Sequence, residues 1–163
     1  MNVFQLPART YGWLFALNAT GIVVCSQING HLLHAVNLRR VLRYANLGQF
    51  AAAGLLVAAT ISAWGGLYAV VVPLYFYVGL VGFVFPNATA LAMADHPKIA
   101  GMASALIGTA QFGAGAIASS ILGLMGNSSA VPMALLIAAC AGLGLVMNLW
   151  MLRTAAPQSV LAA

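Results

Sequence analysis

Two long segments of the chain carry no charged side chain. One lies between Arg43 and Asp95 and has 51 residues, and the other lies between Lys98 and Arg153 and has 54. A soluble protein needs ionisable groups on its surface, and a small core cannot hide so much apolar length. A bilayer core of about 30 Å takes about 20 helical residues, so each segment is long enough for two crossings. The sequence therefore predicts an all-α, polytopic membrane helical bundle.

Composition supports a membrane protein and excludes several other classes. Apolar residues make up 63% of the chain and charged residues 4%. The net charge of +5 comes from basic residues scattered at the ends of the expected spans. We interpret them as topology signals and expect no nucleic-acid partner. Cys25 and Cys140 fall inside expected spans, so a disulfide framework is not expected.

We expect five transmembrane helices in a single membrane domain of residues 1–163. Turn-forming residues divide each uncharged segment, at Trp64–Gly66 in the first and at Gly126–Ser129 in the second. A polar link beginning at Pro86 separates the third span from the fourth. The expected spans cover about residues 11–33, 42–64, 67–85, 99–125 and 131–152.

The basic residues predict the orientation of these spans. With alternating crossings, Arg9 lies on one face and the other five basic residues lie on the opposite face: Arg39, Arg40, Arg43, Lys98 and Arg153. The positive-inside rule places the second face, and with it the C-terminus, in the cytoplasm. Five spans then leave the N-terminus outside, although nothing in the sequence exports it. We therefore expect the chain to lack at least one preceding span and to be a piece of a larger protein.

Small residues recur on the fourth expected span. Gly101, Ala105, Thr109 and Gly113 follow one another at a spacing of four residues, which places them on one face of a helix. Helices in lipid associate through small residues that allow close backbone approach. We expect this stripe to be a helix-packing surface.

A few polar and aromatic residues fall within the expected spans. Gln111 lies near the middle of the fourth span, Asn18 lies on the first, and Tyr75 and Tyr77 lie near the middle of the third. Polar groups inside a membrane face protein or water. These four residues are therefore candidates for a substrate cavity, and the alternative is interhelical hydrogen bonding that holds the bundle together. The second and fifth spans are poor in such groups, so we expect them at the lipid-facing periphery.

Several kinds of site are not expected. No ionisable Asp, Glu, Lys, Arg or His lies in the core of an expected span, so the chain has no proton relay of its own there. His31, His34 and His96 lack the further ligands that a metal site needs, so we expect no metal. No nucleophile elbow, zinc-protease motif or phosphate loop is present, and we expect neither an enzyme nor a bound cofactor.

Five segments resemble one family of transporters. Phe85–Ala92 matches a proline- and asparagine-containing end of a helix, and His96–Gly108 contains an Ala-Gly-x-Ala-Ser-Ala-Leu-x-Gly opening of the next. Tyr11–Asn18 and Ser26–Asn29 are similar to an earlier helix, and Asn37–Arg40 looks like a Gly-x-Arg-Arg loop with Asn in place of Gly. Together they resemble the Bcr/CflA drug-resistance branch of the major facilitator superfamily, over nearly the whole chain.

The resemblance implies a fold and an activity. The five spans would be helices eight to twelve of a twelve-helix transporter, with the first, third and fourth lining its cavity. The N-terminal half of the transporter and one preceding helix would then be absent. Such proteins are multidrug efflux transporters of the inner membrane, which exchange drug-like molecules for protons by alternating access. Membrane lipid, a drug-like substrate, protons and a separately encoded N-terminal half are the partners implied.

An alternative reading remains open at this point. The proton-coupling residues of such antiporters usually belong to the N-terminal half, so we expect this chain to be inactive alone. It is then either the C-terminal portion of an efflux transporter or a non-transporting membrane remnant or helix-packing partner protein. The small-residue stripe is compatible with both.

Overall fold

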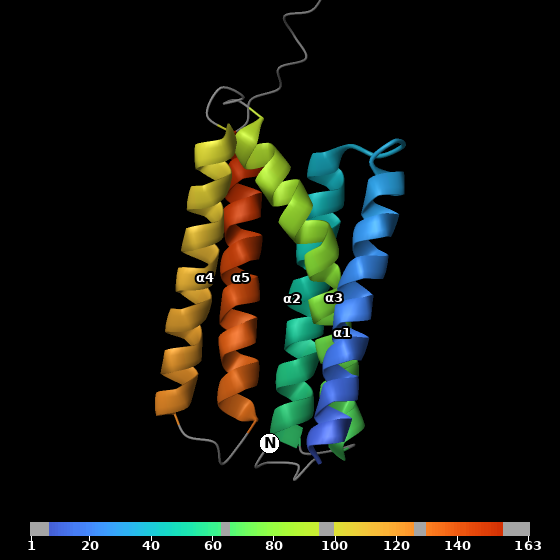
Figure 1. The fold of residues 1–163 in the computed structure, drawn as a ribbon, viewed down its shortest axis with the longest axis vertical. Helices are drawn as coiled ribbons and strands as arrows, with labels where there is room; N and C mark the ends of the chain where they lie inside the picture. The colour runs from blue at the N-terminus through green and yellow to red at the C-terminus, as the bar shows by residue number, and fades with distance from the viewer. Residues whose placement is uncertain (1–6, 63–65, 95–99, 126–129, 155–163) are drawn as a thin grey trace, which may run out of the picture.

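The computed structural model describes residues 7–62, 66–94, 100–125 and 130–154, and these residues form five α-helices without a strand. Each helix is long and apolar enough to cross a membrane. Successive helices run in opposite directions, so that α1, α3 and α5 point one way and α2 and α4 the other (Figure 1). The helices are α1 (Ala8–Leu32), α2 (Leu38–Ser62), α3 (Gly66–Met93), α4 (Ala100–Leu124) and α5 (Val131–Thr154). The predicted all-α, five-helix membrane architecture is confirmed.

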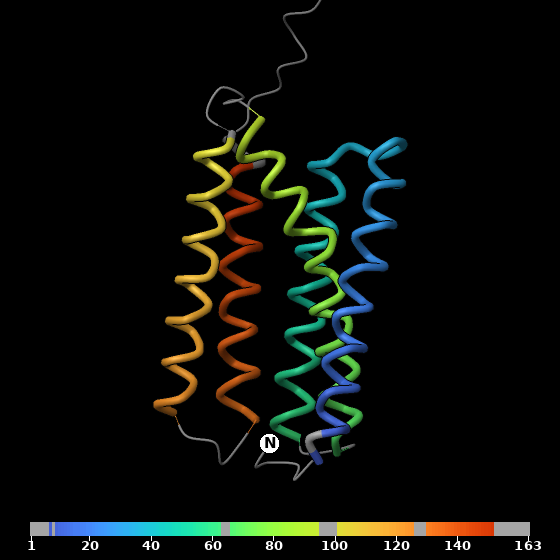
Figure 2. The backbone as a smooth tube through the Cα atoms, viewed as in Figure 1, coloured from blue at the N-terminus to red at the C-terminus, as the bar shows by residue number. Residues whose placement is uncertain are grey.

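Helix α3 extends further than its apolar sequence indicates. It continues through Pro86 and Asn87 to Met93, where we expected a polar link. Proline removes a backbone hydrogen bond inside a helix and bends it, but neighbouring helices in a membrane protein stabilise such positions. Helix α3 contains both Pro73 and Pro86, and its C-terminal part leans away from α1 and α2 towards the start of α4 (Figure 2).

The apolar core lies between α2, α3 and α5. Leu56 and Ala134 are completely buried and pack with Val70. Partly buried side chains from the same three helices surround this cluster: Val57, Leu74, Met133 and Ile137. Helix α1 makes its main contacts with α3, so α3 connects α1 to the core.

Helix α2 is the most buried of the five described helices. A third of the residues in its most apolar segment are buried, against none in the corresponding segment of α4. The buried residues of α2 include Asn46 and Gln49, although we expected this helix to be poor in such groups and to lie at the lipid-facing periphery. Both side chains face neighbouring helices: Gln49 donates a hydrogen bond to α3, and Asn46 lies against Gly144 of α5. Within these five helices α2 is central.

Helix α4 makes few contacts with the rest of the bundle. It lies beside α5 (Figure 1) and has only limited contact with α3 and α5. Its large apolar side chains are widely exposed, with Phe112 at 82% and Leu124 at 90% of full exposure. A helix that is apolar all round and exposed in this way suits a surrounding of lipid or of further helices.

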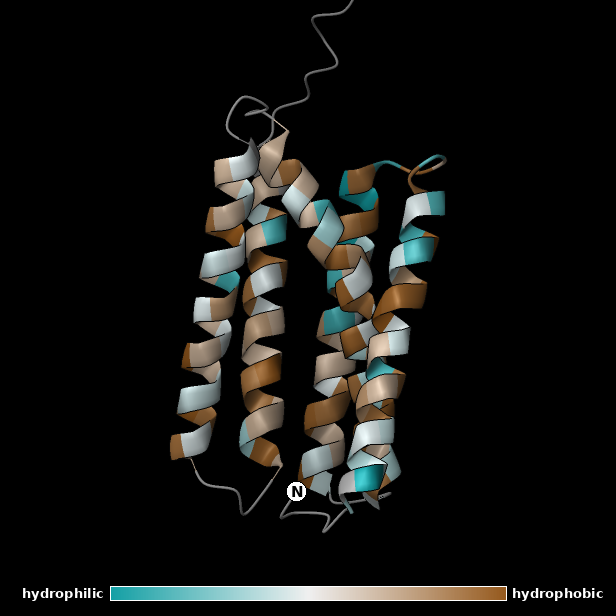
Figure 3. Cartoon of the chain, in the orientation of Figure 1, coloured by the Kyte–Doolittle hydropathy of each residue, from teal (hydrophilic) through white to brown (hydrophobic). Residues whose placement is uncertain are grey.

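Hydrophilic residues gather towards the end of the bundle where α1 leads into α2, and at the start of α1 (Figure 3). Asn37 caps α2 by accepting a hydrogen bond at its Oδ1 from the backbone N–H of Arg39, over 2.9 Å. Arg39, Arg40 and Arg43 are exposed at this end, and Arg9, at the start of α1, lies at the opposite end. Lys98 and the side chain of Arg153 lie outside the described residues.

Candidate functional site

Helices α1 and α3 approach each other closely at two glycines of α3, Gly79 and Gly82. A Cβ atom added at Gly82 would lie 2.5 Å from the carbonyl oxygen of Ile22 and 2.9 Å from the backbone nitrogen of Ser26. Gly79, three residues earlier, faces Cys25 and Gly21 in the same way at 3.5–3.8 Å. Only glycine, which has no Cβ atom, allows the two backbones to approach so closely. Close backbone approach at small residues is a common way for helices to associate in lipid.

A pair of asparagines extends this contact towards the end of the helices where α1 leads into α2. The Nδ2 atom of Asn87 donates to Oδ1 of Asn29 over 2.8 Å, and Nδ2 of Asn29 donates in return to Oδ1 of Asn87 over 3.3 Å. Both side chains are almost fully buried. Polar groups in a low-dielectric interior must be paired, and each amide here satisfies the other.

Two of the predicted cavity residues lie near this contact. The ring of Tyr75 covers Gly21, since a Cβ atom there would lie 3.0 Å from Tyr75 Cε2, and it packs edge-on against Phe76 with ring centroids 5.9 Å apart. Asn18 precedes Gly21 by one helical turn. Its Nδ2 donates to the carbonyl of Leu14 over 3.0 Å, whereas its Oδ1 is buried without a partner. Asn18 and Tyr75 therefore belong to one region between α1 and α3.

The other two predicted cavity residues lie elsewhere. Tyr77 is half-buried, and its backbone carbonyl accepts a hydrogen bond from Nε2 of Gln49 over 3.3 Å. Gln111 is exposed on α4, the helix with few contacts. The structure therefore does not bring Gln111 together with Asn18 or Tyr75, and the assignment of these four residues to a cavity stays a prediction.

The small-residue stripe on α4 is also exposed. Nothing lies within 4 Å of a Cβ atom placed at Gly101 or Gly113. Ala105 and Thr109 are exposed too, and the Thr109 hydroxyl donates to the carbonyl of Ala105 over 2.9 Å. This bond satisfies the hydroxyl within its own helix. The stripe has no partner among the helices described, and its packing role stays a prediction.

Comparison with known proteins gives two relatives. The chain is 29% identical over 140 residues to the bicyclomycin resistance protein homolog of Haemophilus influenzae, across 86% of this chain and 35% of that protein. It is 28% identical over 132 residues to the uncharacterized MFS-type transporter YdgK of Bacillus subtilis, across 81% of this chain and 32% of that protein. These two relatives support the predicted resemblance to the Bcr/CflA branch of the major facilitator superfamily.

Neither relative is named as an enzyme. The chain spans about a third of the length of these two relatives. No protein-family model matches the chain, and no solved structure matches it. The predicted resemblance to such transporters is confirmed by these relatives, and the five apolar helices support a multi-pass membrane protein.

Among the glycines of the described helices, Gly82 has the closest neighbouring backbone atoms, but it was not among the residues that we predicted to pack. Gly79 and Gly82 lie three apart in α3, a spacing that places both on one face of a helix. That spacing was the available signal, but the longer stripe on α4 is the more conspicuous pattern. Asn87 was missed for a different reason, because it follows a proline and was assigned to a link.

Proposed function

We propose that this chain forms helices eight to twelve of a drug-exporting antiporter of the inner membrane. The observation that carries the proposal is the similarity to a bicyclomycin resistance protein homolog over 86% of the chain. The match to about a third of each relative's length agrees with five helices out of twelve. Arg39, Arg40 and Arg43, at the end where α1 leads into α2, would then face the cytoplasm, as would the C-terminus.

The tight α1–α3 contact supports a mechanical role in such a transporter. Alternating access moves helical units largely as rigid bodies around a site near the membrane midplane. Backbone contact at Gly82 and the Asn29–Asn87 pair would hold α1 and α3 together as one such unit. Asn18 and Tyr75 lie on that unit, where they would face the substrate. Gln111 on α4 would complete the lining of the substrate cavity from the other side.

Transport would need residues from outside this chain. Alternating access requires two halves that close around the substrate, and no charged residue lies in the middle of the five described helices. Proton coupling would therefore depend on an N-terminal half, encoded in the same or in a separate gene. The five helices alone would insert into the membrane without exporting drug.

A chimera tests the proposal. The segment of the Haemophilus influenzae relative that aligns with this chain is replaced by the chain, and bicyclomycin resistance is measured in a drug-sensitive bacterium. We expect the chimera to raise the inhibitory concentration above that of an empty vector, and the chain alone to leave it unchanged. A chimera that reaches normal membrane abundance without resistance would favour a non-transporting remnant or packing partner. Resistance from the chain alone would contradict the need for a second half.

A further inference from the structure

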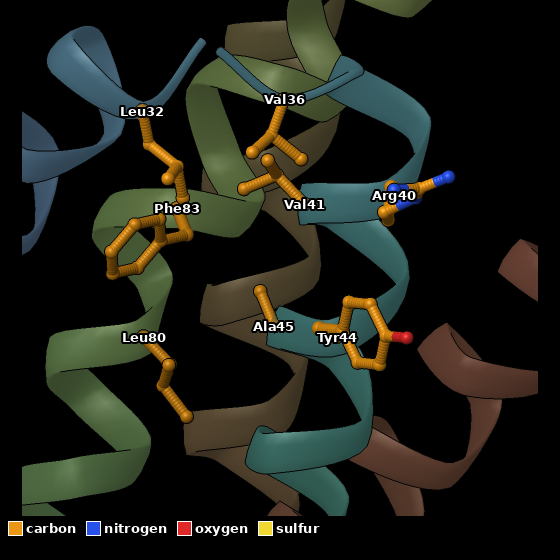
Figure 4. Close-up of a pocket in the computed structure, with 8 residues that line it drawn as sticks. All are labelled: Leu32, Val36, Arg40, Val41, Tyr44, Ala45, Leu80 and Phe83. Carbon is orange, nitrogen blue, oxygen red and sulfur yellow. The ribbon is translucent and has the colours of Figure 1, made fainter.

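A pocket of about 460 Å³ opens at the end of the bundle where α1 leads into α2 (Figure 4). Its volume lies within the range of about 300–1,000 Å³ that is common for ligand pockets. Six apolar side chains from α1, α2, α3 and the α1–α2 connection form its walls: Leu32, Val36, Val41, Ala45, Leu80 and Phe83.

Two polar side chains line the same pocket from successive turns of α2. Arg40 and Tyr44 extend on the same side of the helix, with the guanidinium group and the hydroxyl directed away from Leu80 and Phe83 (Figure 4). Arg40 is exposed, and Tyr44 is 66% exposed. Tyrosine and arginine are typical of the level of the lipid headgroups, where one end of a side chain is apolar and the other is wet.

The electrostatic surroundings of the pocket favour an anion. Arg39 and Arg43 are exposed on the same first turns of α2 as Arg40. The whole sequence contains one acidic residue, Asp95, against six basic ones, so this end of the bundle has a strong excess of positive charge. Basic clusters just outside a membrane span attract anionic lipids.

We propose that this pocket binds one anionic phospholipid, with an acyl chain between α1, α2 and α3 and its phosphate beside Arg40 and Tyr44. A free inorganic anion would leave the apolar walls unused, and a neutral apolar molecule would leave the guanidinium group without a counter-charge. A lipid satisfies both parts of the pocket and is present at high concentration wherever these helices are inserted. The site depends on membrane insertion, not on the proposed transport activity.

Lipid binding by the full chain in detergent micelles tests the site. Phosphatidylglycerol and phosphatidylcholine with identical acyl chains are titrated separately, and bound lipid is counted by native mass spectrometry. We expect one phosphatidylglycerol to bind at least fivefold more tightly than phosphatidylcholine. Arg40→Gln should weaken phosphatidylglycerol binding about fivefold, while Arg9→Gln, the same charge change at the other end of the bundle, should leave it unchanged. Equal affinity for the two lipids would overturn the proposal.

Two further variants separate the pocket from general surface charge. Arg39 does not line the pocket, so Arg39→Gln should change the affinity less than twofold. An effect as large as that of Arg40→Gln would show that only the overall charge matters and would overturn the site. Val36→Trp keeps every charge but fills the pocket, and should abolish the preference for phosphatidylglycerol. Retained preference in this variant, or displacement of the lipid by millimolar inorganic phosphate, would rule out acyl-chain insertion.

Discussion

Asn29 and Asn87, which are 58 positions apart in the sequence, bind each other through both amides between α1 and α3. Only 3% of the surface of Asn29 and 1% of that of Asn87 is exposed. In an apolar environment, each amide would otherwise carry donors and an acceptor without partners. The pair fixes the relative positions of α1 and α3 at the end of the bundle, beyond the glycines at which their backbones approach most closely.

The two asparagines should be strongly coupled in stability. Asn87→Leu leaves the Asn29 amide buried without its partner, so we expect a loss of about 1–3 kcal/mol in unfolding free energy. The double variant Asn29→Leu/Asn87→Leu removes both polar groups and should recover part of that loss. Unfolding of the purified chain by dodecyl sulfate in mixed micelles measures the cycle. Additive losses from the two single changes would show that the amides act independently.

Gly82 should not tolerate any side chain. The Cβ atom of Gly82→Ala would meet backbone atoms of Ile22 and Ser26 at 2.5 and 2.9 Å, and backbone atoms in a helix cannot rotate away as side chains do. Helices α1 and α3 must separate, and overpacking of this kind costs about 1–3 kcal/mol. We expect reduced membrane abundance and an earlier unfolding midpoint.

Gly54 provides a matched control for Gly82. It lies in the interior of α2 and has nothing within 4 Å of a Cβ position. Gly54→Ala should therefore leave stability unchanged or raise it slightly, because alanine favours the helix by up to about 1 kcal/mol. If Gly82→Ala proves as harmless as Gly54→Ala, the close approach of α1 and α3 is wrong.

The sequence predicts the helices better than it predicts their contacts. The uncharged segments and the turn residues between them determine the number, order and direction of the helices, because the membrane requires apolar length. The contacts depend on which faces meet, and apolarity is nearly uniform around these helices. The end of α3 was misjudged at Pro86 for a related reason. A proline usually ends a helix in water, but neighbouring helices stabilise it in a membrane protein.

The prediction that the second span lies at the lipid-facing periphery was wrong, because α2 has buried polar residues that face other helices. Asn46 and Gln49 follow closely after Arg43 in the sequence, yet both are buried. Their partners are the carbonyl of Leu42 within α2 and that of Tyr77 in α3. Nothing in the sequence of α2 alone indicates that α3 supplies such an acceptor.

Gln111 and Gln49 should respond differently to substitution in a complete transporter. Gln111 is exposed on α4, so Gln111→Ala should leave abundance normal and reduce the export of some substrates. Gln49 links α2 to α3, so Gln49→Ala should reduce stability by about 1 kcal/mol and lower the export of all substrates in proportion to abundance. Resistance to a panel of drugs, normalised to protein level, distinguishes the two. Unchanged resistance in Gln111→Ala would exclude this residue from the cavity.

Gly113 should reveal whether the stripe on α4 packs against helices outside this chain. Nothing within 4 Å would oppose a Cβ atom at this position, so Gly113→Leu should leave the stability of the five-helix chain unchanged. In the chimera with the remaining helices of a relative, the same change should lower membrane abundance, because a leucine would hold apart two helices that small residues bring together. Comparison of the two backgrounds isolates the contact. Normal abundance and activity in both would show that this face of α4 lies against lipid.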